Sequence, residues 1–238
     1  STPSNSSAAS DVYKRQVFHD DQHGTAIITG AAVINALKVA GKKIEDVKIV
    51  INGAGAAGIS IGKYLLDLGA KNVIWCDRKG VIVEGQEGIN AAQAELPKIS
   101  NPNKVTGLLS DALVDADIFI GVSAPNIVSK DMIRSMADKA IVFPLANPVP
   151  EISHDDAIEA GAYIIGTGSS KYPNQINNVL VFPGIFRGAL DAGAKDINRE
   201  MMIAASKAIA ESIPEDKLSP ENIIPVSYTH LRAHETKA

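Results

Sequence analysis

The sequence has little cysteine and few aromatic residues, and it lacks long apolar or basic runs. Its one cysteine, Cys76, cannot form an internal disulfide or build a zinc cluster, so nothing indicates an oxidising compartment. No apolar run reaches the roughly 18 residues that cross a bilayer, and the N-terminus lacks the basic start and apolar core of a signal peptide. A net charge of −4 without a basic run makes nucleic acid and anionic membranes poor partners. We therefore expect a cytoplasmic protein that binds neither.

The composition is that of an ordinary globular domain. Apolar residues make up 45% of the 238 residues and charged residues 21%, which excludes a wholly disordered chain, a collagen and a coiled coil. Residues 1–16 and 226–238 show no hydrophobic period, and we interpret both as disordered or non-native flanks of one domain at 17–225. His230 and His234 have a spacing that could hold a metal on a helix, but a solvated tail is the simpler interpretation.

The domain alternates short apolar runs with helical stretches. The runs are rich in β-branched residues and nearly continuously apolar, as strands are when both faces of a parallel sheet are covered. They lie at 47–52, 72–77, 118–123, 140–145 and 163–166. Apolar residues at helical spacing predict helices over 25–38, 59–68 and 197–213. This alternation predicts an α/β fold with a doubly wound, mostly parallel Rossmann-type sheet and helices on both faces.

A glycine pattern follows the first predicted strand and opens a helix; it consists of Gly53-Ala54-Gly55-Ala56-Ala57-Gly58. In the G-x-G-x-x-G pattern the first glycine permits the tight turn, the second lets a pyrophosphate approach the backbone, and the third lets the helix pack close to the sheet. The free N–H groups at the helix start then bind the anion. The alternative is a glycine-rich turn with no ligand. A P-loop is excluded because Tyr64 follows Gly62-Lys63 where Ser or Thr is required.

An acidic residue ends the second predicted strand, as the dinucleotide-binding pattern requires. Asp77 can accept hydrogen bonds from the adenosine ribose and would repel a 2′-phosphate, which favours NAD over NADP. Arg78 and Lys79 follow at once and could instead pair with that phosphate, or they could lie in a solvated turn. The sequence therefore favours NAD without excluding NADP.

A short segment before the first predicted helix concentrates ionisable residues. It contains His19, Asp20, Asp21 and His23. Neighbouring side chains point apart on a strand or extended loop, so one aspartate could bind Mg²⁺ or Mn²⁺ while the other orients a catalytic group. The alternative is helix capping by an aspartate or by Thr25. For the two histidines, a structural hydrogen-bonding role is favoured over zinc binding.

Polar residues also follow the later strands. Asn147 comes directly after a predicted strand, so it projects into the crevice where open α/β sheets bind ligands. Ser123 ends another strand and is a candidate cofactor contact. Asn177 and Asn178 lie between polar and apolar runs, and an amide there could both donate to and accept from a nicotinamide or a small acid. For the asparagines the alternative is a simple turn.

Five separated motifs occur together in one order: FHDDQHGTA, INGAGAAG, WCDRKG, PLANP and YPNQINNVLVFPG. In this order and near these spacings they resemble the NAD-binding domain of bacterial-type malic enzymes, over roughly residues 17–225. The resemblance implies oxidation of L-malate by hydride transfer to NAD(P)⁺, loss of CO₂ and formation of pyruvate, with Mg²⁺ or Mn²⁺ polarising the developing carbonyl. It also implies a homo-oligomer in the intact protein.

The resemblance implies a role for each matching residue. Asp21 would bind the metal, and Asp20 would support the catalytic lysine. The pyrophosphate would contact residues 54–57 of the glycine turn, and the adenosine ribose would contact Asp77. The malate and nicotinamide site would be lined by Asn147 and Asn178.

The family has an N-terminal catalytic domain that supplies the general acid, the general base and two further metal ligands. No counterpart precedes residue 17, so the resemblance implies a partial chain that is inactive alone. The alternatives are a non-catalytic NAD-binding module and the cofactor domain of another dehydrogenase.

Overall fold

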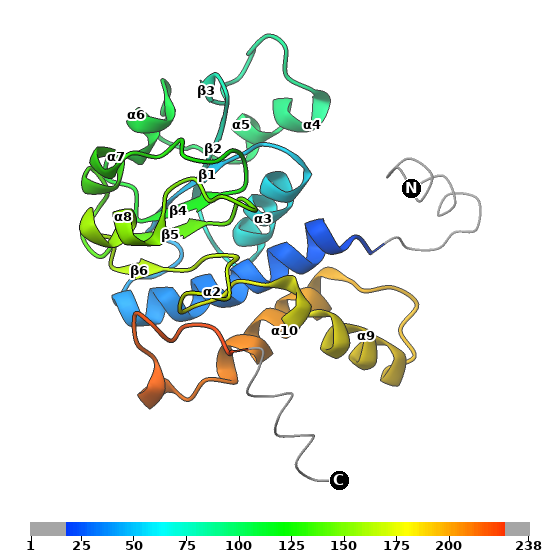
Figure 1. The fold of residues 1–238 in the computed structure, drawn as a ribbon. Helices are drawn as coiled ribbons and strands as arrows, with labels where there is room; N and C mark the ends of the chain where they lie inside the picture. Colours follow the sequence, from blue (N-terminus) through cyan, green and yellow to red (C-terminus); the bar gives the residue numbers. More distant parts are fainter. Residues whose placement is uncertain (1–17, 227–238) are drawn as a thin grey trace.

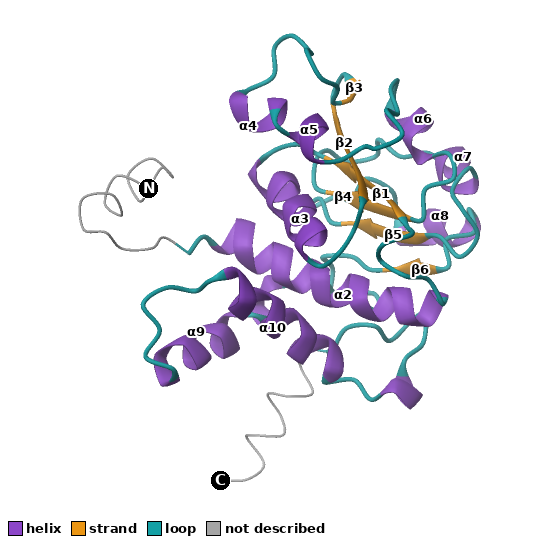
Figure 2. Ribbon diagram, turned by 180° about the vertical axis from the view of Figure 1, so that it is seen from behind, coloured by secondary structure: helices purple, strands orange, loops and turns teal. Residues whose placement is uncertain are grey.

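The computed structural model describes residues 18–226, which form a six-stranded sheet flanked by helices (Figure 1, Figure 2). The strand order is β3-β2-β1-β4-β5-β6. All neighbouring pairs are parallel except β2 and β3. The strands are β1 (Lys48–Asn52), β2 (Asn72–Asp77), β3 (Gly80–Val81), β4 (Ile118–Gly121), β5 (Ile141–Pro144) and β6 (Ile164–Ile165). This confirms the predicted α/β fold with a mostly parallel, Rossmann-type sheet.

Helices connect the strands and cover both faces of the sheet. The longer ones are α2 (Thr25–Ala40), α3 (Ala56–Asp67), α9 (Phe182–Asp191) and α10 (Arg199–Glu211). The shorter ones are α4 (Ala91–Ala94), α5 (Leu96–Ile99), α6 (Leu109–Leu113), α7 (Lys130–Arg134) and α8 (His154–Glu159). Three short turns of other helix types complete the described part: a π-helical turn η1 (Asp20–Gly24) and two 3₁₀ turns, η2 (Asn178–Leu180) and η3 (Glu215–Lys217).

Alternate residues of each strand point to two separate hydrophobic clusters. Ile49 and Ile51 of β1 pack on the side of α2, α3 and α10, whereas Val50 packs on the side of α6, α7 and α8. In Figure 1, α2 and α10 lie together on one side of the sheet, and α6, α7 and α8 lie on the other. Because both faces are covered, the strands are apolar on both faces, which explains their continuous apolar runs.

The long helix α2 is a core element. Its 16 residues are almost all buried, and it ends at Gly41 in the left-handed conformation, as its sequence predicts. Continuous helix from Gln22 to Ala40 is long and apolar enough to cross a membrane, which corrects the expectation that no such run exists. However, 72% of that window is buried inside the domain, so its apolar character is accounted for by core packing.

The predicted elements are confirmed with small shifts at their ends. The last helix begins at Arg199 and ends at Glu211, inside the predicted 197–213, and Asn198 caps its start by accepting from the Met201 N–H group. Predictions for residues 1–17 and 227–238, including the two flanks and the pair His230 and His234, lie outside the described residues.

Candidate functional site

Two adjoining cavities open at the carboxyl ends of β1 and β4, the point where the connections leave the sheet toward opposite faces. The larger has a volume of about 700 Å³ and is lined by the turn after β1 and the tip of β2. The smaller has a volume of about 390 Å³ and lies toward α2, β5 and η2. Val122 and Ser123, directly after β4, line both cavities. Open α/β sheets bind ligands at this position.

The glycine turn between β1 and α3 has the conformation that its pattern predicts. Gly53 has a φ of +116°, which disfavours any side chain. A Cβ on Gly58 would overlap the carbonyl oxygen of Gly53, so only glycine lets α3 start this close to the strand. A Cβ on Gly55 would meet nothing within 4 Å, and Gly55 lines the larger cavity together with Ala54. The backbone at Gly55, at the start of α3, is therefore exposed to the larger cavity and is not covered by any side chain.

The remaining members of the glycine pattern lie on the helix side of the turn. Ala56 is the first residue of α3, and Ala57 lines the smaller cavity. Trp75 of β2 lies beneath this turn and donates its indole N–H to the Gly58 carbonyl at 2.9 Å. The indole also packs where a Cβ on Gly62 would be, so the start of α3 is held tightly against the sheet.

The tip of β2 forms the far end of the larger cavity. Asp77 and Arg78 both line it, as predicted from their position after the glycine turn. The Asp77 carboxylate accepts from the Lys79 N–H at 2.7 Å and from the Gln86 amide at 3.4 Å. These bonds fix the carboxylate at the rim and leave acceptor capacity on both oxygens. That ribose or a 2′-phosphate binds here stays a prediction.

A side chain that the sequence analysis did not identify spans this cavity. Gln93 on α4 donates its amide N–H to the Ala54 carbonyl at 3.0 Å, and both residues line the cavity. Asn90 and Gln93 also form a capping box at the start of α4. The capping pattern Asn-x-x-Gln is visible in the sequence, but the bond to Ala54 joins segments that lie far apart along the chain.

The smaller cavity gathers the predicted polar residues from three separate segments. Ser123 follows β4, Asn147 follows β5, and Asn177 and Asn178 precede and begin η2. Gly168 lies close to the Asn147 amide, since a Cβ there would be 3.1 Å from its nitrogen. The expectation that Asn147, Asn178 and Ser123 lie at one crevice agrees with this geometry, and their ligand remains a prediction.

The acidic segment differs from the extended conformation assumed in the sequence analysis, because it is the π-helical turn η1. A helical turn satisfies backbone hydrogen bonds here: the His23 N–H donates to the His19 carbonyl at 2.8 Å, and η1 continues directly into α2. Capping by an aspartate or Thr25 was the alternative, but the N-cap positions of η1 and α2 are His19 and Gly24, and neither makes a side-chain cap bond.

This turn packs against η2, whose first residue, Asn178, lines the smaller cavity. A Cβ on Gly24 would lie 2.5 Å from the Asp20 Oδ1 atom and 3.3 Å from the Asn178 Cβ, so the Asp20 carboxylate lies next to η2. The two histidines contact each other, since the His19 N–H donates to His23 Nδ1 at 3.0 Å. Burial, followed by the nearby His19, lowers the pKa of His23 below its ordinary value. Both features fit the structural role expected for the histidines.

The metal prediction is not tested by this geometry. The surroundings of the Asp21 side chain are not described, although its backbone lies in η1. Among the side chains that the structure does describe, no group of three His, Cys, Asp or Glu could hold a metal ion. Metal binding by Asp21 therefore stays a prediction.

A buried carboxylate behind the two cavities was also missed. Glu151 is fully buried and lies after β5, where it accepts from the Ser123 N–H at 2.9 Å and from the Ala146 N–H at 3.1 Å. Burial is the first cause that raises its pKa above the ordinary value, opposed by these hydrogen bonds. An isolated acid in a Pro-rich loop gives no sequence signal of such burial.

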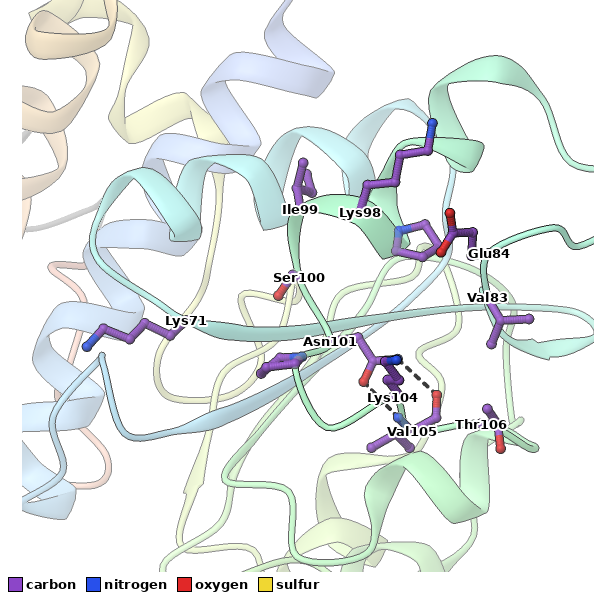
Figure 3. Close-up of a pocket in the computed structure, with 12 residues that line it drawn as sticks. Lys71, Val83, Glu84, Lys98, Ile99, Ser100, Asn101, Lys104, Val105 and Thr106 are labelled. Carbon is purple, nitrogen blue, oxygen red and sulfur yellow. Dashed lines mark hydrogen bonds between the residues drawn. The ribbon is translucent and has the colours of Figure 1, made fainter.

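A further hollow lies away from this site and shares no lining residue with either cavity (Figure 3). It has a volume of about 510 Å³ and includes Lys71, Lys98 and Lys104. Lys71 and Lys98 point in different directions (Figure 3). The Asn101 side chain is paired with the Val105 backbone by two bonds of 2.9 Å. Its charges do not converge on one point, so we assign no ligand to it.

Comparisons with known proteins agree with this geometry. The chain is 54% identical over 213 residues to the bifunctional malic/malolactic enzyme of Bacillus subtilis, covering 89% of this chain and 52% of that protein. It is 51% identical over 209 residues to the NAD-dependent malic enzyme of Geobacillus stearothermophilus, covering 88% of this chain and 44% of that protein. The chain thus spans about half the length of these relatives.

Solved structures and a family model give the same result. The NAD-dependent malic enzyme of Thermotoga maritima superposes with a TM-score of 0.85 at 49% identity, covering 92% of this chain and 58% of that chain. The malic enzyme of Entamoeba histolytica gives a TM-score of 0.83 at 42% identity, covering 88% and 45%. The family model described as "Malic enzyme, NAD binding domain" matches residues 22–234. The chain therefore belongs to the malic enzyme NAD-binding domain family.

Proposed function

We propose that this chain is the dinucleotide-binding part of an enzyme that converts L-malate to pyruvate and CO₂ with hydride transfer to NAD(P)⁺. The observation that carries the proposal is the meeting of two cavities at Ser123. One cavity covers the open glycine turn, and the other is lined by amide side chains. A dinucleotide in the first would reach the second, where a small polar acid fits.

The residues of the larger cavity fit a dinucleotide. The backbone at Gly55 is unobstructed, so a pyrophosphate can approach the N–H groups at the start of α3, where the helix dipole favours an anion. The carboxylate of Asp77 at the other end suits ribose hydroxyl groups. Its negative charge disfavours a 2′-phosphate, which supports NAD as the preferred cofactor, while Arg78 beside it is the group that would favour NADP.

In the proposed reaction the bound dinucleotide supplies the hydride acceptor. Asn147 and Asn178 would donate amide N–H groups to the carboxylates of malate, and thereby orient its C2–H bond toward Ser123 and the cofactor cavity. The Asp20 carboxylate, next to Asn178, would orient the catalytic lysine that the resemblance implies. That lysine and the general acid would come from parts of the protein outside this chain.

A metal ion would need ligands beyond the described residues, because no three of their carboxylate, imidazole or thiol groups gather at one point. Asp21 is the proposed ligand from this chain to Mg²⁺ or Mn²⁺. Further carboxylate ligands would have to come from the remaining half of the malic enzyme length.

Two measurements test the proposal. Fluorescence titration of this chain with NADH and NADPH should give saturable binding that is tighter for NADH. The longer polypeptide containing this chain should reduce NAD⁺ with L-malate and not with glutamate or leucine. Binding of neither nucleotide would reject the dinucleotide site, and turnover of an amino acid instead of malate would reject the substrate.

A further inference from the structure

We propose that Glu151 is a positioning residue that fixes the wall between the two cavities, so that a bound dinucleotide can extend from one cavity into the other. The inference rests on the proposed function, because it assigns the nicotinamide end of the cofactor to this junction. It concerns a fully buried carboxylate that lines neither cavity itself.

The Glu151 carboxylate joins two loops that follow different strands. One oxygen accepts from the Ser123 N–H after β4 at 2.9 Å, and the other accepts from the Ala146 N–H after β5 at 3.1 Å. Ser123 lines both cavities, and Ala146 precedes Asn147 on the wall of the smaller one. A single carboxylate therefore sets the separation of the two loops that meet at the junction.

The network extends to a third strand tip. Asn52, the last residue of β1, donates its amide N–H to Ser123 Oγ at 2.6 Å. Asn52 is followed at once by the glycine turn. The tips of β1, β4 and β5 are thus connected in order through Ser123 and Glu151.

The fold makes room for this carboxylate specifically. Gly121 ends β4, and a Cβ there would overlap the carboxyl carbon of Glu151. The Glu151 backbone is fixed as well, since its carbonyl accepts from the Val128 N–H at 3.0 Å. Burying a carboxylate is costly unless it is hydrogen-bonded, and the two N–H donors supply that compensation. The absence of a side chain at Gly121 on β4 thus leaves the space that the Glu151 carboxylate fills.

Replacing the Glu151 carboxylate should weaken binding of the nicotinamide end of the dinucleotide more than binding of its adenosine end. In Glu151→Gln the amide nitrogen cannot accept, so one of the two loop N–H groups loses its partner. The loop positions around Ser123 then shift, whereas Asp77 and the helix start at Gly55 are held by other contacts. We therefore expect NADH binding to weaken and ADP binding, which needs only the adenosine and pyrophosphate positions, to persist.

The experiment compares wild type, Glu151→Gln and a control, Glu45→Gln, in the same chain. Glu45 is exposed and precedes β1, at the other end of the sheet. Dissociation constants for NADH and ADP are measured by fluorescence and calorimetry, with thermal unfolding to verify the fold. We expect Glu151→Gln to raise the Kd for NADH about tenfold, the effect of one hydrogen bond to a charged group, with the Kd for ADP within about twofold.

Equal losses for NADH and ADP, or no loss for NADH, would overturn the positioning role. If Glu151→Gln fails to fold, Glu151→Asp keeps the charge but is one methylene too short to reach both loops, and it should show the same split between NADH and ADP. Failure of wild type to bind either nucleotide would overturn the proposed function instead, and this inference with it.

Discussion

Replacing Gly55 by alanine should separate folding from dinucleotide binding. The Gly55 backbone has φ −84° and ψ −171°, which alanine adopts without strain. A Cβ there meets no heavy atom within 4 Å. Alanine restricts the unfolded chain, which favours folding, but Gly55 is the N-cap of α3, where alanine is less favourable than glycine. Because these two effects oppose each other, we expect the free energy of unfolding to change by less than about 1 kcal/mol.

Dinucleotide binding should respond much more strongly than stability. The added methyl group would occupy the space through which a pyrophosphate approaches the N–H groups at the start of α3. Losing one such hydrogen bond to a charged group costs about 1.5–3 kcal/mol, and each 1.4 kcal/mol is a factor of ten in affinity. The Kd for NADH should therefore rise about 10- to 100-fold. Titration by NADH fluorescence, together with urea unfolding, measures both quantities on one sample.

Two other glycine variants make the comparison specific. Gly188→Ala on α9 also meets open space and should change neither NADH binding nor, beyond a small helix-propensity gain, stability. Gly58→Ala should unfold or severely destabilise the domain, because its Cβ overlaps the Gly53 carbonyl oxygen. An unchanged Kd for NADH in a folded Gly55→Ala protein would refute the assignment of the pyrophosphate to this turn.

Three further predictions concern single side chains. Asp77→Ala should weaken NADH binding by about 1.5–3 kcal/mol and NADPH binding by less, and parallel titrations check this. Tyr64→Phe should lower the free energy of unfolding, measured in urea, by about 1 kcal/mol, because the Tyr64 hydroxyl donates to the Met202 carbonyl and contacts Ser206. Burial raises the pKa of this hydroxyl to about 12, so it keeps its proton. The control is Tyr163→Phe, at an exposed tyrosine. Burial raises the Glu151 pKa above its ordinary value of 4.5, so the contribution of this group is fully present at low pH and is lost as pH rises through the folded-state pKa. The free energy of unfolding of wild type relative to Glu151→Gln should thus fall as the pH rises from 4.5 toward neutrality, and a rise would contradict the raised pKa.

The larger cavity, our proposed dinucleotide site, could be predicted from sequence in part because several of its determinants are local. The strand, the glycine turn and the following helix lie within one short segment, and a Cβ on Gly58 would overlap the carbonyl oxygen of Gly53, five residues earlier. Gly53 is required by its positive φ and also by the Val122 carbonyl after β4, which lies far away along the chain, whereas Gly55 has open space around it. Asp77 was predictable for a related reason, since adjacent parallel strands end at the same edge of the sheet. The same rule placed Ser123 and Asn147 at one crevice.

Residues whose role depends on distant partners could not be predicted. Gln93 reaches the Ala54 carbonyl across the cavity, and Glu151 is buried by the strand tips around it rather than by its own segment. Polar residue types are usually exposed, so composition alone assigns both to the surface. The prediction that the acidic segment is extended was wrong for a different reason. The segment has only a few residues, so neither an apolar period nor a helix-breaking residue distinguishes an extended loop from a helical turn.

The helical form of the acidic segment brings the Asp20 carboxylate close to the segment that carries Asn178. In η1, Asp20 and Gly24 are four residues apart and therefore lie on one face of the turn. The face is closed by Asn178 and Phe182, and a side chain at Gly24 would meet both of them as well as the Asp20 carboxylate. Glycine at this position thus lets the acidic turn pack against the segment that carries the second asparagine. That asparagine lines the smaller cavity beside Asn147, and so does Thr25, the residue that follows the acidic turn. The acidic turn therefore packs directly behind one wall of the cavity that holds the amide cluster.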